Sequence, residues 1–222
     1  MSVLTMTLDD GVAVIRIDDG KANAVSQDFI AEMHAALDET EKSADAVVIV
    51  GRPGRFSAGF DLKVMMNDPA AAGDLVTAGG QLFTRIFEYP KPVIAACTGH
   101  ALAAGALLLL ACDTRIGTKG DYKLGLNETA IGMTLPDYGI ILPQARLEPR
   151  HFTSAVIQAK IHSPEEAVEA GFLDAVADEG ALEETAMAAA NALKALPGSA
   201  YAGNKRKIRA EAIAALHASF AS

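Results

Sequence analysis

The chain has 222 residues, of which 50% are hydrophobic, 19 are Lys or Arg and 28 are Asp or Glu, so its formal net charge at pH 7 is -9. This apolar content excludes a disordered protein and suffices for one large domain, or one domain with a small appendage, without disulfides or metals. The negative charge argues against nucleic acid as a partner, because phosphate backbones bind cationic surfaces.

The N-terminus and the longest apolar run predict a soluble, cytoplasmic protein with no membrane partner. The first ten residues lack the basic start and the continuous apolar segment of a secretory signal. The longest apolar run, Ala101 to Cys112, has 12 residues, and roughly 20 are needed to cross a bilayer. The two cysteines, Cys97 and Cys112, suit a reducing compartment and indicate no disulfide framework.

Strands and helices alternate in the first 130 residues. The β-branched run Val12–Ile17 predicts a strand, Ser26 is a suitable N-cap, and the continuous apolar run Ala46–Val50 is typical of a strand buried on both faces. In chain order we expect a strand at 12–17, a helix at 26–42, a strand at 46–50, a helix at 75–89, a strand at 92–97, a helix at 101–111, and short strands at 114–117 and 122–126.

The remainder of the chain is predicted to be mainly helical. Ser163 and Glu166 form a capping box with Pro164 at the first helical position, and Gly171 is a suitable C-cap. Pro197 and Gly198 precede a final helix at 202–221. This order of elements predicts an α/β layered domain with a helical C-terminal segment.

Several common chemistries lack their motif. The chain has no G-x-x-x-x-G-K-[ST] for nucleotide phosphates, no H-E-x-x-H for zinc and no G-x-G-x-x-G for dinucleotides. Ser57 misses the G-x-S-x-G pattern by one residue and has no evident triad partner. No metal site is predicted, because the histidines show no ligand spacing and a surface or capping role is expected for each: His34, His100, His151, His162 and His217.

Two loops of small residues are candidates for binding a developing negative charge. Phe56–Lys63 and Thr98–Ala106 each come after a predicted buried strand. Helix N-termini present unpaired N–H groups, and two such groups from separate loops make an oxyanion hole. Tight turns with small residues, present for packing alone, remain the other interpretation.

The segment Gly125–Met133 holds one carboxylate, Glu128, in an apolar stretch. Partial desolvation raises a carboxyl pKa toward the range that suits a general base. The alternative is an N-cap or a surface glutamate.

Taken together, these motifs resemble the crotonase (enoyl-CoA hydratase/isomerase) family. The resemblance rests on Phe56–Leu62, Pro92–Ala96 with Gly99, Ala104–Gly105, Cys112–Asp113 and Gly125–Glu128, in the family's order and spacing. It implies a crotonase-like α/β spiral of β-β-α units, expected at residues 1–195. Residues 196–222 are then a helical C-terminal segment, shortened relative to the family.

The resemblance also implies the site. The N–H groups of Phe60 and Ala104 are expected to hold the thioester oxygen of an acyl-CoA substrate, and Gly105 to allow close approach. CoA is part of the substrate, so no separate cofactor is expected. The other substrate- or CoA-binding residues implied are Lys21, Ala22, Ala58, Leu62, Lys63, Leu107, Pro136 and Asp137.

Leu107 distinguishes two family reactions. Hydratases of this family use two glutamates, one at the position of Leu107 and one at that of Glu128. An isomerase needs one base, which removes the C2 proton and returns it to C4. The sequence is therefore similar to the Δ3,Δ2-enoyl-CoA isomerases, with Glu128 as the base.

Alternatives remain open from the sequence. Asp137 is either a second acid/base of a hydratase or another enolate-forming enzyme, or a turn aspartate, and the fold can also persist in a catalytically silent acyl-CoA-binding protein. The basic run Lys205–Arg209 is either a site for the CoA phosphates or a solvated helix face. A homotrimer or a dimer of trimers is expected by resemblance.

Overall fold

The structure, a computed structural model, describes residues 2–221 and arranges their strands in two sheets. The larger has the order β1-β2-β3-β5-β7-β9 and the smaller the order β4-β6-β8. The strands of the larger sheet are β1 (Leu4–Asp9), β2 (Val12–Ile17), β3 (Ala46–Val50), β5 (Val93–Cys97), β7 (Thr114–Thr118) and β9 (Ala175–Ala177). Those of the smaller are β4 (Gly54–Ser57), β6 (Gly99–Leu102) and β8 (Leu124–Gly125).

Successive strand pairs share one plan. β1 and β2 are antiparallel, and the other neighbouring pairs of both sheets are parallel. The pairs β3–β4, β5–β6 and β7–β8 each give one strand to each sheet before the chain turns into a helix. This repetition confirms the spiral of β-β-α units and the α/β class.

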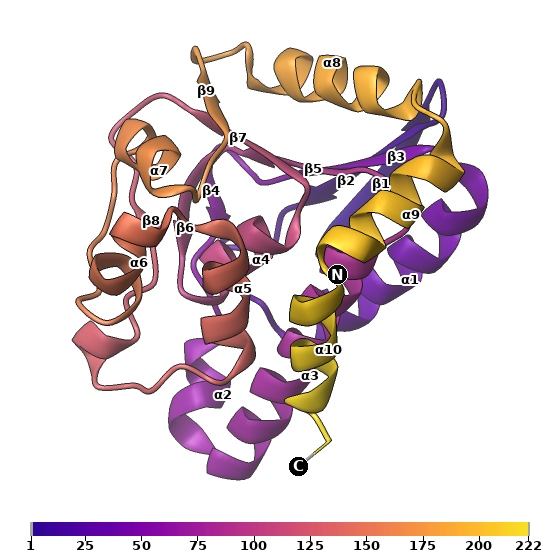
Figure 1. Cartoon of the computed structure of the whole chain (residues 1–222). Coiled ribbons are helices and arrows are strands. Elements are labelled where there is room, and N and C mark those ends of the chain that lie inside the picture. The colour runs from indigo at the N-terminus through magenta and orange to yellow at the C-terminus, as the bar shows by residue number, and fades with distance from the viewer. Residues whose placement is uncertain (1, 222) are drawn as a thin grey trace.

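Helices cover both faces of the larger sheet (Figure 1). They are α1 (Gln27–Ser43), α2 (Leu62–Asn67), α3 (Pro69–Glu88), α4 (Ala104–Ala111), η1 (Thr129–Ile131), α5 (Tyr138–Arg146), α6 (Pro149–Val156), α7 (Pro164–Ala170), α8 (Leu182–Lys194), α9 (Gly198–Ile208) and α10 (Ala210–Ala218). One face packs against α8 through Leu182, Ala186 and Ala190, and the other against the core that includes α1, α3 and α4. Within the described residues no helix is both long and apolar enough to cross a membrane.

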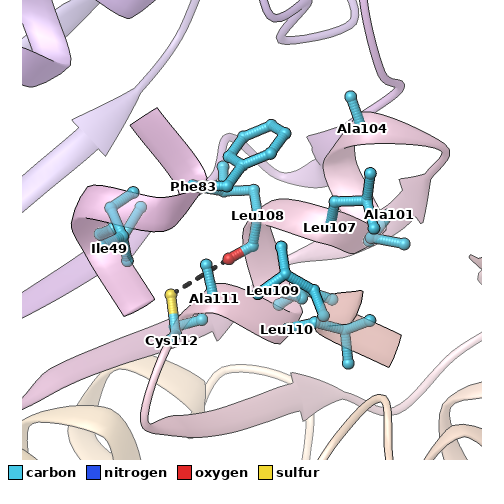
Figure 2. Close-up of a cluster of buried hydrophobic side chains, with 14 of the residues drawn as sticks. Ile49, Phe83, Ala101, Ala104, Leu107, Leu108, Leu109, Leu110, Ala111 and Cys112 are labelled. Atoms are coloured by element: carbon cyan, nitrogen blue, oxygen red, sulfur yellow. Dashed lines mark hydrogen bonds between the residues drawn. The ribbon is translucent and has the colours of Figure 1, made fainter. Parts of the chain in front are cut away.

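Helix α4 lies inside this main core, because each of its residues from Ala104 to Ala111 is buried. Figure 2 shows its leucines packed near Ile49 and Phe83, with the Cys112 thiol donating a hydrogen bond to the Leu108 carbonyl oxygen at 3.3 Å. Both cysteines are free and buried. The longest apolar run of the sequence is thus a core element that holds its N-terminal residue, Ala104, in a fixed place.

The predicted helix caps are confirmed. Ser26 Oγ accepts the Phe29 N–H at 3.2 Å, and both hydrogen bonds of the Ser163–Glu166 capping box are present. Gly171 ends α7 with φ 89, a left-handed conformation that glycine adopts without strain.

The sequence did not predict β1, β4, β9 or α2, and several boundaries of the other elements differ from the prediction. Helix α3 begins at Pro69 rather than 75, because Asp68 caps it by accepting the N–H groups of Ala70 and Ala71. Residues 99–102 form β6 rather than the start of a helix, and a Cβ on Gly99 would lie 2.2 Å from the Gly54 carbonyl carbon. The final helix divides at Arg209 into α9 and α10.

Candidate active site

Three segments meet at the carboxyl edge of the small sheet. Ala58–Phe60 follow β4, Ala103–Ala104 follow β6, and Asn127–Glu128 come two residues after β8. The three strands are parallel, with Ser57 paired to Ala101 and Leu102 to Gly125, so their carboxyl ends lie side by side. Ligands of parallel sheets bind at such edges. The strand order thus brings together motifs that are more than 60 residues apart in the sequence.

A cavity of about 370 Å³ lies at this edge. Glu128 is its one carboxylate among the described residues, and most of the other lining side chains are apolar. The lining residues are Ala58, Phe60, Leu62, Met65, Val76, Ala103, Leu107, Asn127, Glu128, Ile131, Met133, Thr134, Leu135, Pro136 and Tyr138. An apolar space with few polar groups is typical of a site that binds an apolar ligand in one orientation.

The loops after β4 and β6 touch one another. A Cβ placed on Gly59 would lie 2.9 Å from the Ala103 Cβ and 3.4 Å from the Ala104 nitrogen, and one on Gly105 would lie 2.2 Å from the Ser57 carbonyl oxygen. Glycine at both positions is therefore what allows β4 and the start of α4 to approach this closely.

The backbone is strained where α4 begins. Ala103 has φ 51 and ψ -125, a region that alanine rarely adopts and that costs about 1–3 kcal/mol. Its carbonyl accepts the N–H groups of Ala106 and Leu107, at 2.9 and 3.1 Å. Within residues 2–221, the Phe60 and Ala104 N–H groups donate no hydrogen bond to another group of the protein.

Glu128 is 8% exposed, and its Oε2 is buried without a hydrogen-bond partner in the part of the chain that the structure describes. Its backbone carbonyl accepts the N–H groups of Ile131 and Met133, but its side chain forms no cap hydrogen bond to η1. Burial raises the pKa of this carboxyl above its ordinary value of 4.5. The surface and N-cap interpretations of Glu128 are therefore wrong for the side chain, which faces the cavity.

Of the residues predicted for the substrate, Ala58, Leu62, Leu107 and Pro136 line the same cavity as Glu128 and Phe60. Leu107 is buried and presents an apolar surface there. Ala104 and Gly105 lie buried directly behind the lining residue Ala103.

The residues expected near CoA lie beside one rim of the cavity. The Ala58 N–H donates to the Ala22 carbonyl at 3.0 Å, which places Lys21 and Ala22 next to the lining residue Ala58. Lys63 is exposed in the first turn of α2, next to the lining residue Leu62.

Asp137 is not brought to the cavity wall. It is exposed at the N-terminus of α5, between the lining residues Pro136 and Tyr138, and its backbone carbonyl accepts the Ile140 and Ile141 N–H groups at 2.9 Å. The structure therefore gives this aspartate the place of a turn residue.

The basic run at 205–209 fits neither interpretation as a whole. Lys205 Nζ lies 2.8 Å from Asp113 Oδ2, and both side chains are nearly buried. Arg209 lies 3.0 Å from Asp113 Oδ1 and stacks 4.2 Å from the centre of the Phe87 ring. These two cations anchor α9 to the core, and Arg206 and Lys207 remain exposed.

Three polar residues that the sequence considered lie outside the candidate site. Ser57 is fully buried and its Oγ accepts the Gly59 N–H at 3.3 Å, so it supports the turn after β4. His162 is 1% exposed beside Phe172, so the surface or capping role expected for it is wrong. His100 is on strand β6 and its Nδ1 accepts the Lys123 N–H at 2.9 Å, so it caps no helix.

Sequence reasoning missed Tyr138, Val76 and Met65, which come from α5, α3 and α2. Met65 lies three residues after the motif that ends at Leu62, and Tyr138 directly follows Asp137, whereas Val76 lies on a helix far from the motifs. Which of their side chains line the cavity depends on the tertiary packing. Sequence reasoning also gave no role to Asn127, whose Oδ1 is buried and unpaired among the described residues. A buried amide next to a buried carboxylate is the signal that could have marked it.

Comparison with known proteins agrees with this fold. A family model described as Enoyl-CoA hydratase/isomerase matches residues 7–222. A crystal structure of an enoyl-CoA hydratase/isomerase family protein from Pseudomonas syringae superposes with a TM-score of 0.96, at 43% identity, and covers 98% of this chain and 95% of that one. The chain therefore belongs to the enoyl-CoA hydratase/isomerase, or crotonase, family.

Named relatives divide between two activities. Human mitochondrial enoyl-CoA delta isomerase 1 is 31% identical over 204 residues, which are 90% of this chain and 68% of the human protein. The probable enoyl-CoA hydratase of Bacillus subtilis is 37% identical over 137 residues, 60% of this chain and 53% of that protein. The matched segment thus spans about half to two thirds of these relatives, and their names alone do not distinguish isomerase from hydratase.

Proposed function

We propose that the protein is an acyl-CoA double-bond isomerase, which converts a 3-enoyl-CoA into the 2-enoyl-CoA. The observation that carries the proposal is that Glu128 is the one carboxylate of the cavity among the described residues, and that the apolar side chain of Leu107 lines the same cavity. Addition of water requires a group that activates the water and one that protonates the α-carbon. One base suffices to move a proton.

In the proposed mechanism the Phe60 and Ala104 N–H groups bind the thioester oxygen. When Glu128 removes a proton from C2, the C–H electron pair forms a C1–C2 double bond and the charge moves onto the thioester oxygen, where the two N–H groups stabilise this dienolate. When the dienolate collapses, the carbonyl re-forms, the C1–C2 pair becomes the C2–C3 double bond, and the former C3–C4 π pair takes up the proton that Glu128 returns to C4. Backbone donors held by a strained turn and a buried helix need no reorganisation as the charge develops.

The environment of Glu128 supports a proton shuttle. A raised pKa brings a carboxylate closer to the acidity of the carbon that it deprotonates, and an apolar cavity slows exchange of the proton with water. We further propose that Lys21, Ala22 and Lys63 lie along the CoA moiety, because they border the rim at Ala58 and Leu62.

A substrate panel tests this proposal. Purified protein is incubated with 3-enoyl-CoA and with 2-enoyl-CoA esters, and the products are followed for double-bond migration and for 3-hydroxyacyl-CoA. The expected result is migration with 3-enoyl esters and no hydration of 2-enoyl esters. Hydration as the faster reaction would favour the hydratase, and ester binding without any reaction would favour the silent binding protein.

A further inference from the structure

Tyr138 separates the cavity from aromatic rings that lie behind it. Its side chain lines the cavity and is 2% exposed. The ring centre lies 6.2 Å from that of Phe83 and 5.9 Å from that of Phe220, and neither of these two phenylalanines lines the cavity. The Tyr138 ring is therefore a single-residue wall.

Helix α3 fixes this wall at two points. A Cβ on Gly80 would lie 2.4 Å from Tyr138 Cε1 and 2.9 Å from Phe220 Cε1, so the ring packs directly on the helix backbone. The Tyr138 hydroxyl donates to the Val76 carbonyl oxygen at 2.8 Å, one turn earlier on the same helix. A glycine in the middle of a helix is unfavourable, and here it makes the room that the ring occupies.

The Tyr138 wall and the side where CoA is proposed to enter come from different elements. The segment at Lys21–Ala22 borders the cavity at Ala58, whereas Tyr138 of α5 borders it together with Val76 of α3. An acyl chain that extended from the thioester past Glu128 to the side formed by α3 and α5 would meet the Tyr138 ring.

We propose that Tyr138, seated on Gly80, is a specificity-determining residue that closes the distal end of the acyl cavity and limits the length of acyl chain accepted. The inference rests on the proposed function in taking this cavity as the acyl site. The alternative is that a long chain leaves the cavity at Leu62 or Ile131, which line it and are 66% and 54% exposed. If the acyl chain ends at Tyr138, a change at this residue should alter the accepted chain length. If the chain leaves at Leu62 or Ile131, the accepted length should stay the same.

Two variants move the wall in opposite directions. Tyr138→Leu removes the ring and should raise kcat/KM for the longest ester relative to the shortest by about tenfold, since a methylene in an apolar pocket is worth at least that much. Gly80→Ala places a methyl against the ring and should shift the preference toward short esters. Gly73→Ala on the same helix is the control, because a Cβ there meets nothing within 4 Å.

The measurement is kcat/KM for 3-enoyl-CoA esters of increasing length with each folded variant. Binding of saturated acyl-CoA esters of the same lengths is measured alongside and reports on the wall even if no ester is isomerised, so failure of the proposed function is distinguishable. A preference for longer esters in Tyr138→Leu together with a preference for shorter esters in Gly80→Ala supports the proposal. If Tyr138→Leu leaves the dependence of kcat/KM on acyl length unchanged, the proposal is overturned and the acyl chain is assigned to the exit at Leu62 or Ile131. If Tyr138→Leu does not fold, an unchanged length dependence in Gly80→Ala overturns the proposal in the same way.

Discussion

The Glu128 carboxylate is reactive because, among the described residues, no cation or hydrogen-bond donor stabilises its charge. The pKa of Glu183 is lowered because that carboxylate accepts hydrogen bonds from Arg16. Glu128 is buried and has no cation beside it among the described residues, so burial raises its pKa. The sequence identified this residue because a single carboxylate stood in an apolar stretch, but its orientation into the cavity depends on β8 and η1.

The raised pKa predicts a shifted pH profile. Because Glu128 acts as a base only when ionised, kcat/KM for 3-enoyl-CoA should rise with pH through a midpoint above the ordinary carboxyl value of 4.5. A pH series of initial rates measures this midpoint. A midpoint at or below the ordinary value would contradict a desolvated base.

The same shift predicts an effect on stability. A carboxyl whose folded pKa exceeds its unfolded value stabilises the fold below the unfolded pKa and loses that contribution as pH rises through the folded pKa. Glu128→Gln cannot ionise, so it should unfold at a higher temperature than the wild type at neutral pH. Thermal unfolding curves should converge below pH 4.5. If Glu128→Gln were less stable than the wild type at neutral pH, the ionised carboxylate would be stabilising the fold, which would contradict the prediction.

At the scale of elements, close contacts between strands and helix ends set the geometry of the two N–H groups. The small residues of both loops were visible in the sequence, and they marked the candidate oxyanion hole. What the sequence did not reveal is that residues 99–102 form a strand, since Ala101 and Leu102 begin an apolar run that is equally typical of a helix. Packing of Gly99 against the Gly54 backbone decides between the two.

Gly105→Ala tests the contact between β4 and α4. The added Cβ would lie 2.2 Å from the Ser57 carbonyl oxygen, so the start of α4 must move and take the Ala104 N–H with it. Loss of one such donor typically lowers kcat by about 10²–10³-fold, and steady-state kinetics should show this. Gly203→Ala, where a Cβ meets nothing within 4 Å, should leave the rate unchanged. Equal rates in the two variants would contradict the role of Ala104.

Asp113→Asn tests the anchor of α9. The substitution leaves Lys205 and Arg209 nearly buried without their anion, and breaking such a pair costs roughly 3–5 kcal/mol of unfolding free energy. Denaturant unfolding measures the change. Asp178→Asn removes the exposed partner of Lys119 and should have little effect. Similar losses in the two variants would show that the Asp113 cluster does not anchor the helix.

At the scale of the whole molecule, the sequence predicted the α/β class and the strands β2, β3 and β5 correctly, but it did not predict β1. It could not predict the far wall of the cavity, because Val76 and Tyr138 come from helices whose local sequence carries no signal of the site. The spiral order of strands brings all these residues to one edge. The motifs therefore predict the family, whereas the shape of the pocket depends on the tertiary packing.

The most direct test of a one-base isomerase compares wild type, Glu128→Gln and Asp137→Asn on the same 3-enoyl-CoA ester. The account predicts that Glu128→Gln loses at least about 10²–10⁴-fold in kcat, the usual contribution of a positioned base, while still binding the ester. It predicts that Asp137→Asn stays close to wild type, since Asp137 is exposed outside the cavity lining. Near-normal migration by Glu128→Gln, or its loss in Asp137→Asn, would contradict the assignment of Glu128 as the base.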